Sequence, residues 1–570
     1  MRMTYIGQAG LVIEAAGATI VCDPWLSVHG AFNAGWFQLP ANQHLLPWLQ
    51  ARKIDYLYLS HSHLDHFDEE TLAALPKDAT LLVAAFPSKP WRKLVQGLGF
   101  ARVEFLKTFE ERELAPGLRA TIVHAPTPFA HDSALILEDV RSGQVIVNLN
   151  DCKIDEAQQQ RIRGRHPRIA AVLAQFSGAT WFPFVYDFPE AERVAAARQK
   201  NRNGMRRWRG YMRALAPEWT VPFAGPPAIL DPQTGRYMRG PDTIFTTPPD
   251  LMEFLLEEEP EIAASTPLLL PGDALDFDRE EVIEDAAAHA AFSWQQLDDY
   301  IPGYAEQMRP YVAEAIARYP VPGEPLYPAF KAYFELLFAA APRFSIAVDA
   351  RVLFEVEGCG GGRWLADFRE QTVADFSDDP RPREQLCDYS FRLESRYMQA
   401  LIGYRLRWDD FMLSFRFRAW RPSVAAYNEN LITFLRFAHP DELKVQDMLL
   451  SKASALYQST SFTLQTAGGA YAVQQFCPHM GEKLSQSCYD AERGVLVCPR
   501  HGWTFAVPGG ECQNARARVR IAPVAADMAA QQPGGGTAHG RDPAGGDRHG
   551  HDALPHGSAP GLVGGDVSGQ

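Results

Sequence analysis

Residues 54–66 have the sequence IDYLYLSHSHLDH, an apolar run that passes directly into three histidines and an aspartate. Such a short apolar run predicts a buried β-strand. His61 and His63 are two positions apart at the strand end, so they lie on the same side and can share one metal ion. Asp65 and His66 follow at the turn, placed for a second ion, and these ligand types suit zinc and iron equally. The stretch therefore predicts a metal site at the end of a buried strand.

The sequence around this stretch alternates between strand-like and helical segments up to about residue 265. The strand-like runs are LVIEAAGATIVC, YLYLSH, TLLVAAF, ALILEDV and QVIVNL. Strands that alternate with helices in this way are typical of α/β layers. Residues 1–265 are therefore predicted to form one domain that contains the metal site.

The remaining sequence predicts two further domains and a tail. Residues 266–457 combine helical spacing with strand-like runs such as ARVLFEVEG, which indicates an α+β middle domain. Residues 458–525 are predicted to form a small all-β domain. Residues 526–570 are rich in Gly, His, Asp and Pro and nearly lack large apolar residues, so they predict a disordered tail.

A second group of metal-binding residue types lies in the all-β segment. Cys477 and His479 form a C-x-H pair, and Cys498 and His501 form a C-x-x-H pair. A Rieske [2Fe–2S] cluster takes two thiolates on one iron and two imidazoles on the other, which two such loops supply. A structural Cys₂His₂ zinc site accepts the same residues but usually pairs like with like, and cysteines buried without a metal leave the paired histidines unexplained.

Residues 456–525 resemble the Rieske ferredoxins and oxygenases. The respiratory-complex type adds a cysteine to each loop, where this chain has Glu482 and Arg500. The resemblance implies a low-potential, electron-delivering cluster. Because low-complexity sequence begins soon after Val524, we expect the domain to be short at its final strand.

The H-x-H-x-D-H pattern resembles that of the metallo-β-lactamase fold. Asp23 is similar to the aspartate that braces the metal loop in that family. His131 lies where the next metal histidine is expected, with His124 as the competing candidate, and Asp151 lies where the bridging carboxylate belongs. The resemblance implies an αββα fold and a metal site held by His61, His63, Asp65, His66, His131 and Asp151, with Asp65 and His66 as catalytic candidates.

The last metal histidine of that family has no counterpart in this chain. It normally follows a late strand, here TVPFAGPP at residues 220–227, which contains Phe223 and Ala224 instead. An ordinary dizinc hydrolase would need the full set of ligands. The sequence thus disfavours a hydrolase.

A further resemblance links the two metal sites. The segments VNLNDC, AQFSGATWFPF and RRWRGYMRAL within residues 145–230, and WDDFMLSFRFR in the middle domain, are similar to the CMP-N-acetylneuraminate hydroxylase family. That family combines a Rieske domain with a lactamase-like domain, although its Rieske domain is N-terminal. The resemblance implies electrons delivered by a separate reductase or by a ferredoxin- or cytochrome-type carrier.

The helical segment after residue 198 and the middle domain each leave two interpretations open. A run of basic residues could face an anionic substrate or form a solvated helix face; it comprises Lys200, Arg202, Arg206, Arg207, Arg209 and Arg213. The aromatic strands of the middle domain resemble sterol-carrier-like modules. A role as an interdomain scaffold is the expectation there.

The overall composition narrows the classes of function. The chain has 570 residues, a formal net charge of −14 and only eight cysteines. The negative charge argues against a nucleic-acid binder, and the sparse cysteines argue against a disulfide scaffold. No apolar run approaches a membrane span and the N-terminus does not resemble a signal peptide, so we expect a cytoplasmic protein.

Together these features predict a cytoplasmic oxidoreductase of the monooxygenase type. In it a [2Fe–2S] cluster would feed electrons to non-haem iron in the lactamase-like domain, for oxidation of a small-molecule substrate. The alternative is a metallo-β-lactamase-type hydrolase with zinc in that site and a redox-sensing or structural Rieske domain. A non-catalytic electron carrier is a third hypothesis, which the set of three histidines disfavours.

Overall fold

A computed structural model describes residues 1–86, 88–126, 131–478, 483–499, 502–515 and 517–524, without the side chains of residues 450–459. The predicted tail therefore lies outside the described residues. Residues 1–524 cluster as one unit of the chain.

Two sheets dominate the N-terminal part of the chain. The first has the order β14-β13-β1-β2-β3-β4-β5-β6 and the second the order β12-β11-β10-β9-β8-β7. The strands of the first sheet are β1 (Arg2–Gly7), β2 (Gly10–Ala15), β3 (Ala18–Cys22), β4 (Tyr56–Leu59), β5 (Thr80–Ala84), β6 (Arg102–Leu106), β13 (Ala274–Asp276) and β14 (Glu281–Ile283). Those of the second are β7 (Glu110–Ala115), β8 (Leu118–His124), β9 (Ser133–Asp139), β10 (Gln144–Asn150), β11 (Ala171–Gln175) and β12 (Trp219–Phe223).

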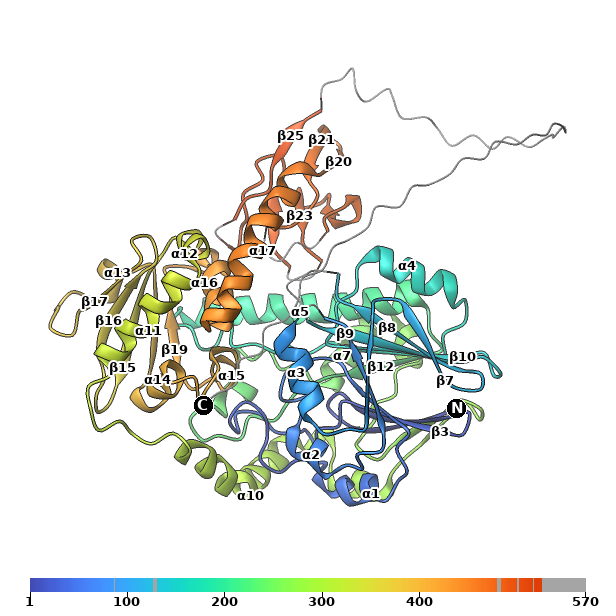
Figure 1. Ribbon diagram of the computed structural model, residues 1–570. Coiled ribbons are helices and arrows are strands. Elements are labelled where there is room, and N and C mark those ends of the chain that lie inside the picture. The colour runs from blue at the N-terminus through green and yellow to red at the C-terminus, as the bar shows by residue number, and fades with distance from the viewer. Residues whose placement is uncertain (87, 127–130, 479–482, 500–501, 516, 525–570) are drawn as a thin grey trace, which may run out of the picture. The chain divides into compact units, whose positions relative to one another are not determined.

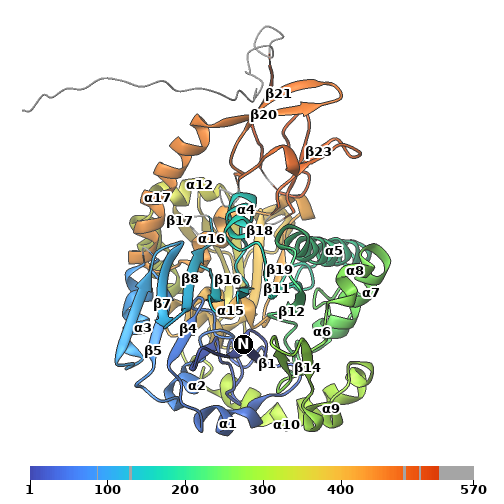
Figure 2. The same cartoon turned by 90° about the vertical axis from the view of Figure 1, so that its right-hand side faces the viewer.

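The two sheets pack face to face with helices outside them, as Figures 1 and 2 show. Leu57 and Leu81 of the first sheet share a core with Leu135 and Leu173 of the second. A separate core joins the other face of the second sheet to the helices α4 (Glu156–Arg165), α5 (Glu190–Leu215) and α7 (Pro248–Glu258). The helices α1 (Leu46–Gln50), α2 (Glu69–Ala74) and α3 (Lys89–Gly97) contribute to the core of the first sheet. This is the predicted αββα arrangement.

The strands β3, β4, β5 and β6 run parallel to one another. Parallel strands are covered on both faces, which is why β4 and β5 are continuous apolar runs rather than alternating ones. Their carboxyl ends meet at one edge of the sheet. The loop that contains His61 begins at that edge.

The predicted boundary at residue 265 falls before the last strands of the first sheet. Strand β13 pairs antiparallel with β1, and β14 pairs with β13. We therefore use the name N-terminal domain for residues 1–283. The sequence did not indicate these two strands because each has only three residues.

The middle domain is α+β, as predicted. Its sheet has the order β17-β16-β15-β18-β19. The strands are β15 (Arg351–Glu357), β16 (Gly362–Asp367), β17 (Thr372–Asp375), β18 (Tyr389–Glu394) and β19 (Arg418–Trp420). The main helices are α10 (Leu297–Ala317), α11 (Tyr327–Ala340), α12 (Pro342–Val348), α14 (Ser395–Ile402), α15 (Trp408–Leu413), α16 (Glu429–Arg436) and α17 (Pro440–Ser459).

One hydrophobic core joins the N-terminal and middle domains. Trp36 and Phe184 of the first belong to the same buried cluster as Phe354 and Phe415 of the second. Within it, Arg416 and Asp231 form a buried ion pair of 2.7 Å, each side chain 1% exposed. The two domains therefore fold against each other over an apolar interface.

The C-terminal domain consists of two small sheets. The first contains β20 (Ser461–Thr466), β21 (Gly469–Gln474) and β25 (Ile521–Pro523), and the second contains β22 (Tyr489–Asp490), β23 (Val495–Val497) and β24 (Thr504–Ala506). The final strand is short but present, since β25 pairs with β21. Among the described residues, no helix is long and apolar enough to cross a membrane.

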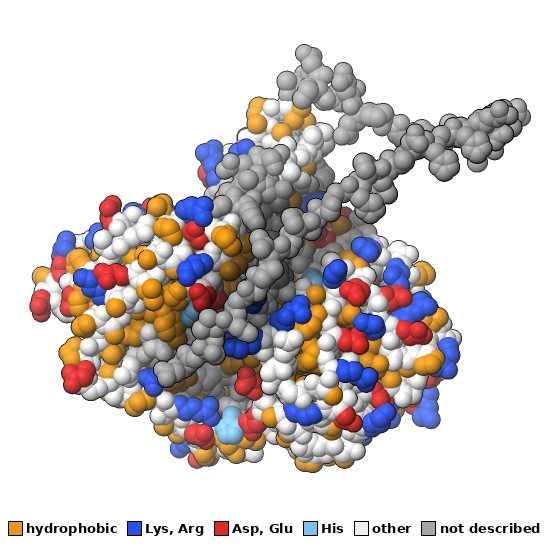
Figure 3. Space-filling view, in the orientation of Figure 1, with side chains coloured by type: hydrophobic (Ala, Val, Ile, Leu, Met, Phe, Trp, Pro, Cys, Tyr) orange, Lys and Arg blue, Asp and Glu red, His pale blue; other side chains and the backbone are white. Residues whose placement is uncertain are grey.

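Charged side chains of both signs are interspersed on the face shown in Figure 3. This face therefore presents no large field of a single sign.

Candidate metal centre

The metal loop is braced by the neighbouring strand end. Asp23 directly follows β3, which lies beside β4 in the sheet. Its Oδ1 accepts a hydrogen bond from the Ser60 backbone N–H at 2.8 Å, and its Oδ2 accepts one from Ser60 Oγ at 2.6 Å. The same Oδ2 lies 2.9 Å from Nδ1 of His66. The buried aspartate thus orients both the loop backbone and one imidazole.

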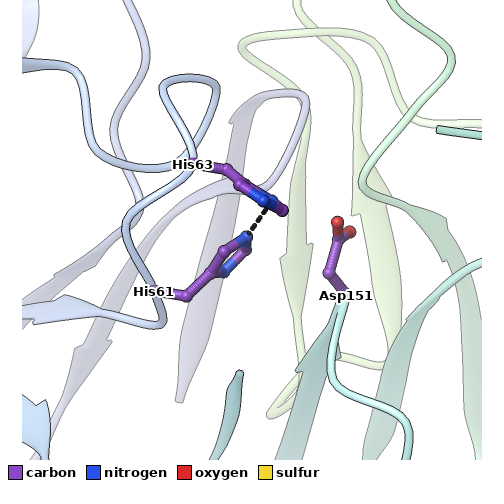
Figure 4. Close-up of side chains that lie close together, drawn as sticks. All are labelled: His61, His63 and Asp151. Carbon is purple, nitrogen blue, oxygen red and sulfur yellow. Dashed lines mark hydrogen bonds between the residues drawn. The ribbon is translucent and has the colours of Figure 1, made fainter. Parts of the chain in front are cut away.

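His61, His63 and Asp151 converge from opposite sheets. Figure 4 shows the two histidines on the loop after β4 and Asp151 at the end of β10, with their side chains pointing toward one another. His61 Nε2 lies 2.9 Å from His63 Nδ1, and one ligand atom from each of the three residues falls within 4.8 Å of the others. Two imidazoles and a carboxylate at this spacing can hold one metal ion.

His66 supplies a test of whether a second ion fits. Its Nε2 is buried and makes no hydrogen bond. It lies 3.7 Å from Asp65 Oδ2 and 3.6 Å from Asp151 Oδ1. Ligand atoms that share one ion sit roughly 3.4 Å apart, because each is about 2.1 Å from the metal. The orphaned nitrogen and the two carboxylates therefore fit a metal ion between them.

The charge around His66 also favours a cation. Burial by itself would lower the pKa of His66, but Asp65, Asp151 and Asp23 outweigh it and raise the pKa to about 10. Burial, together with the neighbouring His66 and His63, holds the pKa of His61 well below its usual range. The same pocket thus contains a neutral imidazole beside a surplus of negative charge, the donor set that a divalent ion prefers.

Two glutamines orient the carboxylates. Gln8 Nε2 donates to Asp65 Oδ2 at 3.0 Å, and Gln175 Nε2 donates to Asp151 Oδ1 at 2.8 Å. Gln175 is the last residue of β11, which runs parallel to β10. The side chains of Gln175 and Asp151 therefore arise at the same edge of the second sheet. Such contacts around ligands fix their orientation. Neither glutamine belongs to a motif that is visible in the sequence.

His131 is not among the residues whose ligand atoms lie within 4.8 Å of one another. Its ring stacks on Phe86 with centroids 5.3 Å apart, and burial lowers its pKa. Residues 127–130, which lead to it, lie outside the described residues. The competitor His124 places its Nε2 3.0 Å from the carbonyl oxygen of Leu106. A ligand role for His131 stays a prediction.

The position of the absent last histidine is apolar. Strand β12 ends at Phe223, which is fully buried, and Ala224 follows with a φ of 52°. Neither side chain can bind a metal ion.

One acidic residue near the site was missed by the sequence analysis. Asp409, in the first turn of α15, places its Oδ2 3.5 Å from His63 Nε2. It belongs to the middle domain, and its only signal was the acidic pair within the aromatic stretch WDDF. A residue 346 positions away in sequence cannot be assigned to a loop before the fold is known.

The cysteines of the predicted cluster are both buried. Cys477 is fully buried and Cys498 is 1% exposed, in a small core with Trp503 and Phe505. The Cys498 N–H donates to the Trp503 carbonyl at 2.7 Å, and Gly502 turns the loop with a φ of 70°. His479 and His501 lie outside the described residues. The loops thus place both thiols in one small apolar core, which suits a buried cluster.

Residues of the basic run on α5 differ in their surroundings. Arg209 and Arg213 form ion pairs with Glu258 and Glu259 at the end of α7, so their charges are used in contacts between two helices. Lys200 differs, because burial beside Arg207 and Lys153 lowers its pKa to about 7. Lys200, unlike Arg209 and Arg213, stays a candidate for contact with an anionic substrate.

Comparison with known families assigns each domain. Residues 2–184 match the β-lactamase superfamily domain, residues 326–451 the Rv3818-like, SCP2-like domain, and residues 434–525 the Rieske [2Fe-2S] domain. The predicted resemblance of the middle domain to sterol-carrier-like modules is thereby confirmed.

Three relatives show how far the likeness extends. A Mycolicibacterium smegmatis protein described as a Rieske 2Fe-2S iron–sulfur protein is 31% identical over 538 residues, which cover 90% of this chain and 98% of that one. A Mycobacterium tuberculosis protein of the same description is 32% identical over 540 residues, with the same coverage. The cytidine monophosphate-N-acetylneuraminic acid hydroxylase of Mus musculus is 25% identical over 290 residues, which cover 49% of this chain and 47% of that enzyme.

Proposed function

This chain belongs to the family of the mycobacterial Rieske 2Fe-2S iron–sulfur proteins, and from that premise we propose that it is a Rieske-dependent non-haem iron oxygenase of the hydroxylase type. The observation that carries the proposal is the combination of a Rieske domain with a metal site that lacks the late histidine of the hydrolases. A one-electron carrier has no use beside a hydrolytic zinc site, but it can supply a metal that activates dioxygen. The relation to a hydroxylase over about half the chain supports the same reaction class.

The proposal assigns the residues as follows. His61, His63 and Asp151 hold the first ion, and Asp65 and His66 hold the second together with Asp151. His131 is the further ligand proposed for the first ion. Iron, when bound there, would supply the activation of dioxygen. The [2Fe–2S] cluster is assigned to Cys477, His479, Cys498 and His501.

The protein's own side chains then have defined tasks. Asp23 holds His66 by Nδ1, so its Nε2 faces the two carboxylates. Gln8 and Gln175 donate to Asp65 Oδ2 and Asp151 Oδ1, the two oxygens that face His66, and so fix the orientation of both carboxylates. The burial of His61 and His66 keeps bulk water away from these two imidazoles. We also propose that two lysines face an anionic group of the substrate: Lys153, whose Nζ donates to the Asp151 carbonyl at 3.2 Å, and Lys200, whose pKa Lys153 helps to lower.

A hydrolase with zinc in the same site is the second candidate. The match of residues 2–184 to the β-lactamase superfamily favours it. In that case the Rieske domain would serve as a redox sensor or as a structural element.

The test compares two cysteine variants of the full chain. Anaerobically purified protein is analysed for iron, zinc and acid-labile sulfide, and reductant-dependent dioxygen consumption is measured. We expect iron beyond the two cluster atoms, and loss of the dioxygen consumption in Cys477→Ser. The matched control is Cys512→Ser, since Cys512 is a half-buried cysteine of the same domain that is not a predicted ligand.

Two results would contradict the oxygenase. One is zinc in the site together with ester or phosphodiester cleavage that does not respond to reductant. The other is a Cys477→Ser protein that keeps its full activity, since hydrolysis can survive loss of the cluster and oxygenation cannot.

A further inference from the structure

We propose that Asp409 of the middle domain is a positioning residue of the metal site, and that it holds His63 by Nε2 so that Nδ1 faces the ion. The inference rests on the metal site of the proposed function. It adds that this site is built by two domains rather than by the β-lactamase-superfamily domain alone.

The two ring nitrogens of His63 have different surroundings. Nδ1 lies 2.9 Å from His61 Nε2, on the side where Asp151 also converges. Nε2 lies 3.5 Å from Asp409 Oδ2. An imidazole that binds a metal through one nitrogen generally donates the N–H of the other to a carboxylate or carbonyl. Nδ1 is therefore the ligand atom, and Nε2–H points at Asp409.

Asp409 is fixed from the other side by an arginine. Arg436, the last residue of α16, places Nε 2.9 Å from Asp409 Oδ1 and Nη2 3.4 Å from Oδ2. Such a two-point contact defines the plane of a carboxylate as well as its place. Arg436 thus contacts both oxygens of Asp409, and one of them, Oδ2, also faces His63.

The burial of the carboxylate supports this role. Asp409 is only 7% exposed. A buried carboxylate beside a ligand histidine sets the tautomer of that histidine and raises its basicity.

The shared core explains how Asp409 is held at a fixed place beside the loop that contains His63. The N-terminal and middle domains bury one continuous apolar cluster, in which Phe32 and Phe411 both take part. Phe32 also meets the ring of His63 at a 71° angle with centroids 6.2 Å apart. The ring of His63 is thus held by an aromatic contact from its own domain and by a carboxylate from the next.

The competing explanation is that Asp409 forms a structural ion pair with Arg436 and nothing more. The middle domain contains a matched example of such a pair. Asp447 accepts from Arg343 Nε at 2.9 Å and from the backbone N–H of Phe344 at 2.7 Å, and it is also buried. Asp447→Asn therefore removes the same charge from the same domain but leaves His63 untouched.

The experiment measures metal binding rather than turnover. Full-length wild type, Asp409→Asn, Asp409→Glu and Asp447→Asn are freed of metal at the N-terminal site and titrated anaerobically with Co²⁺. The affinity and the visible absorption of the bound Co²⁺ are both recorded. The absorption of the [2Fe–2S] cluster reports that each variant is folded.

We expect Asp409→Asn to lower the Co²⁺ affinity by about 10- to 100-fold and to shift the cobalt absorption. Asp409→Glu, which keeps the charge, should recover part of the affinity. Asp447→Asn should bind Co²⁺ as the wild type does. An Asp409→Asn protein with wild-type affinity and an unchanged cobalt spectrum would overturn the inference.

The same titration separates this inference from the proposed function. A wild-type chain that binds no Co²⁺ contradicts both. A wild-type chain that binds Co²⁺ with no effect of Asp409 contradicts only the positioning role. If Asp409→Asn and Asp447→Asn lose affinity equally, the loss reflects domain stability and the positioning role is wrong.

Discussion

At the scale of single residues, the turn at Gly502 joins the cluster loop to helix α5. Its φ of 70° is one that side-chain-bearing residues avoid, and a Cβ placed there would lie 2.5 Å from Asn203 Nδ2. We expect Gly502→Ala to lower the content of [2Fe–2S] cluster in purified protein, because both the turn and its contact with α5 are disturbed. Iron and sulfide analysis and the visible absorption of the cluster measure this.

The control for Gly502→Ala has the same backbone conformation without the contact. Gly494 has a φ of 64° and nothing within 4 Å of its Cβ position, so Gly494→Ala carries the conformational cost alone, about 1 kcal/mol. Adding Asn203→Ala to Gly502→Ala should restore part of the cluster content. Equal losses in Gly502→Ala and Gly494→Ala would show that the contact with α5 is unimportant.

At the scale of elements, helix α16 contacts one residue that faces His63 and one that packs against the loop of the predicted cluster. Its C-terminal Arg436 binds Asp409, while Glu429 in its first turn accepts a hydrogen bond of 2.6 Å from Tyr427 Oη. The ring of Tyr427 meets Trp503 of the cluster loop at 89°, with centroids 6.0 Å apart. One helix thus connects a residue beside His63 with a residue beside the cluster.

We expect the ring of Tyr427 to matter for electron flow from the cluster. Tyr427→Leu removes both the ring contact and the hydrogen bond, whereas Tyr427→Phe removes the hydrogen bond alone. The rate at which dioxygen re-oxidises the reduced cluster in iron-loaded protein should fall more in the first variant than in the second. Stopped-flow absorption of the cluster measures it, with Tyr404→Leu, a change of an exposed tyrosine of the same domain, as control. Equal rates in all variants would contradict this route.

At the scale of the whole molecule, charged pairs join the N-terminal and middle domains around the shared core. Asp187 accepts hydrogen bonds from Arg383 Nη1 at 2.8 Å and from Arg418 Nη2 at 2.8 Å, both in the middle domain. Burial would raise the pKa of Asp187, but the two arginines outweigh it and hold the pKa below its ordinary value of 3.8. Folding therefore favours the ionised form of this carboxylate.

The lowered pKa of Asp187 determines how the stability of the protein depends on pH. The contribution of Asp187 is fully present above its ordinary pKa and is lost as the pH falls through the lower pKa of the folded state. We expect Asp187→Asn to lower the free energy of unfolding by about 1–3 kcal/mol at pH 7, with the difference from wild type shrinking below about pH 4. Denaturant unfolding at several pH values measures this. Asp441→Asn, a change of an exposed carboxylate, should show no such difference.

Local sequence was sufficient for the elements that are continuous along the chain. The apolar run before His61 predicted β4, the H-x-H-x-D-H pattern predicted the loop that brings His61, His63, Asp65 and His66 together, and the spacing of Cys477 and Cys498 predicted the loops of the Rieske domain. These features depend on residues a few positions apart, whose geometry the backbone conformation sets directly.

The sequence by itself thus determined the three domain types and the residue types available for two metal sites. Only the tertiary structure decided that Gln8 and Gln175 hold the carboxylates, that the ring of His131 stacks on Phe86, and that Asp409 of another domain reaches His63. The physical reason is that these contacts join segments that are distant in sequence. Their meeting depends on how two sheets and two domains pack around shared cores, which no local pattern records.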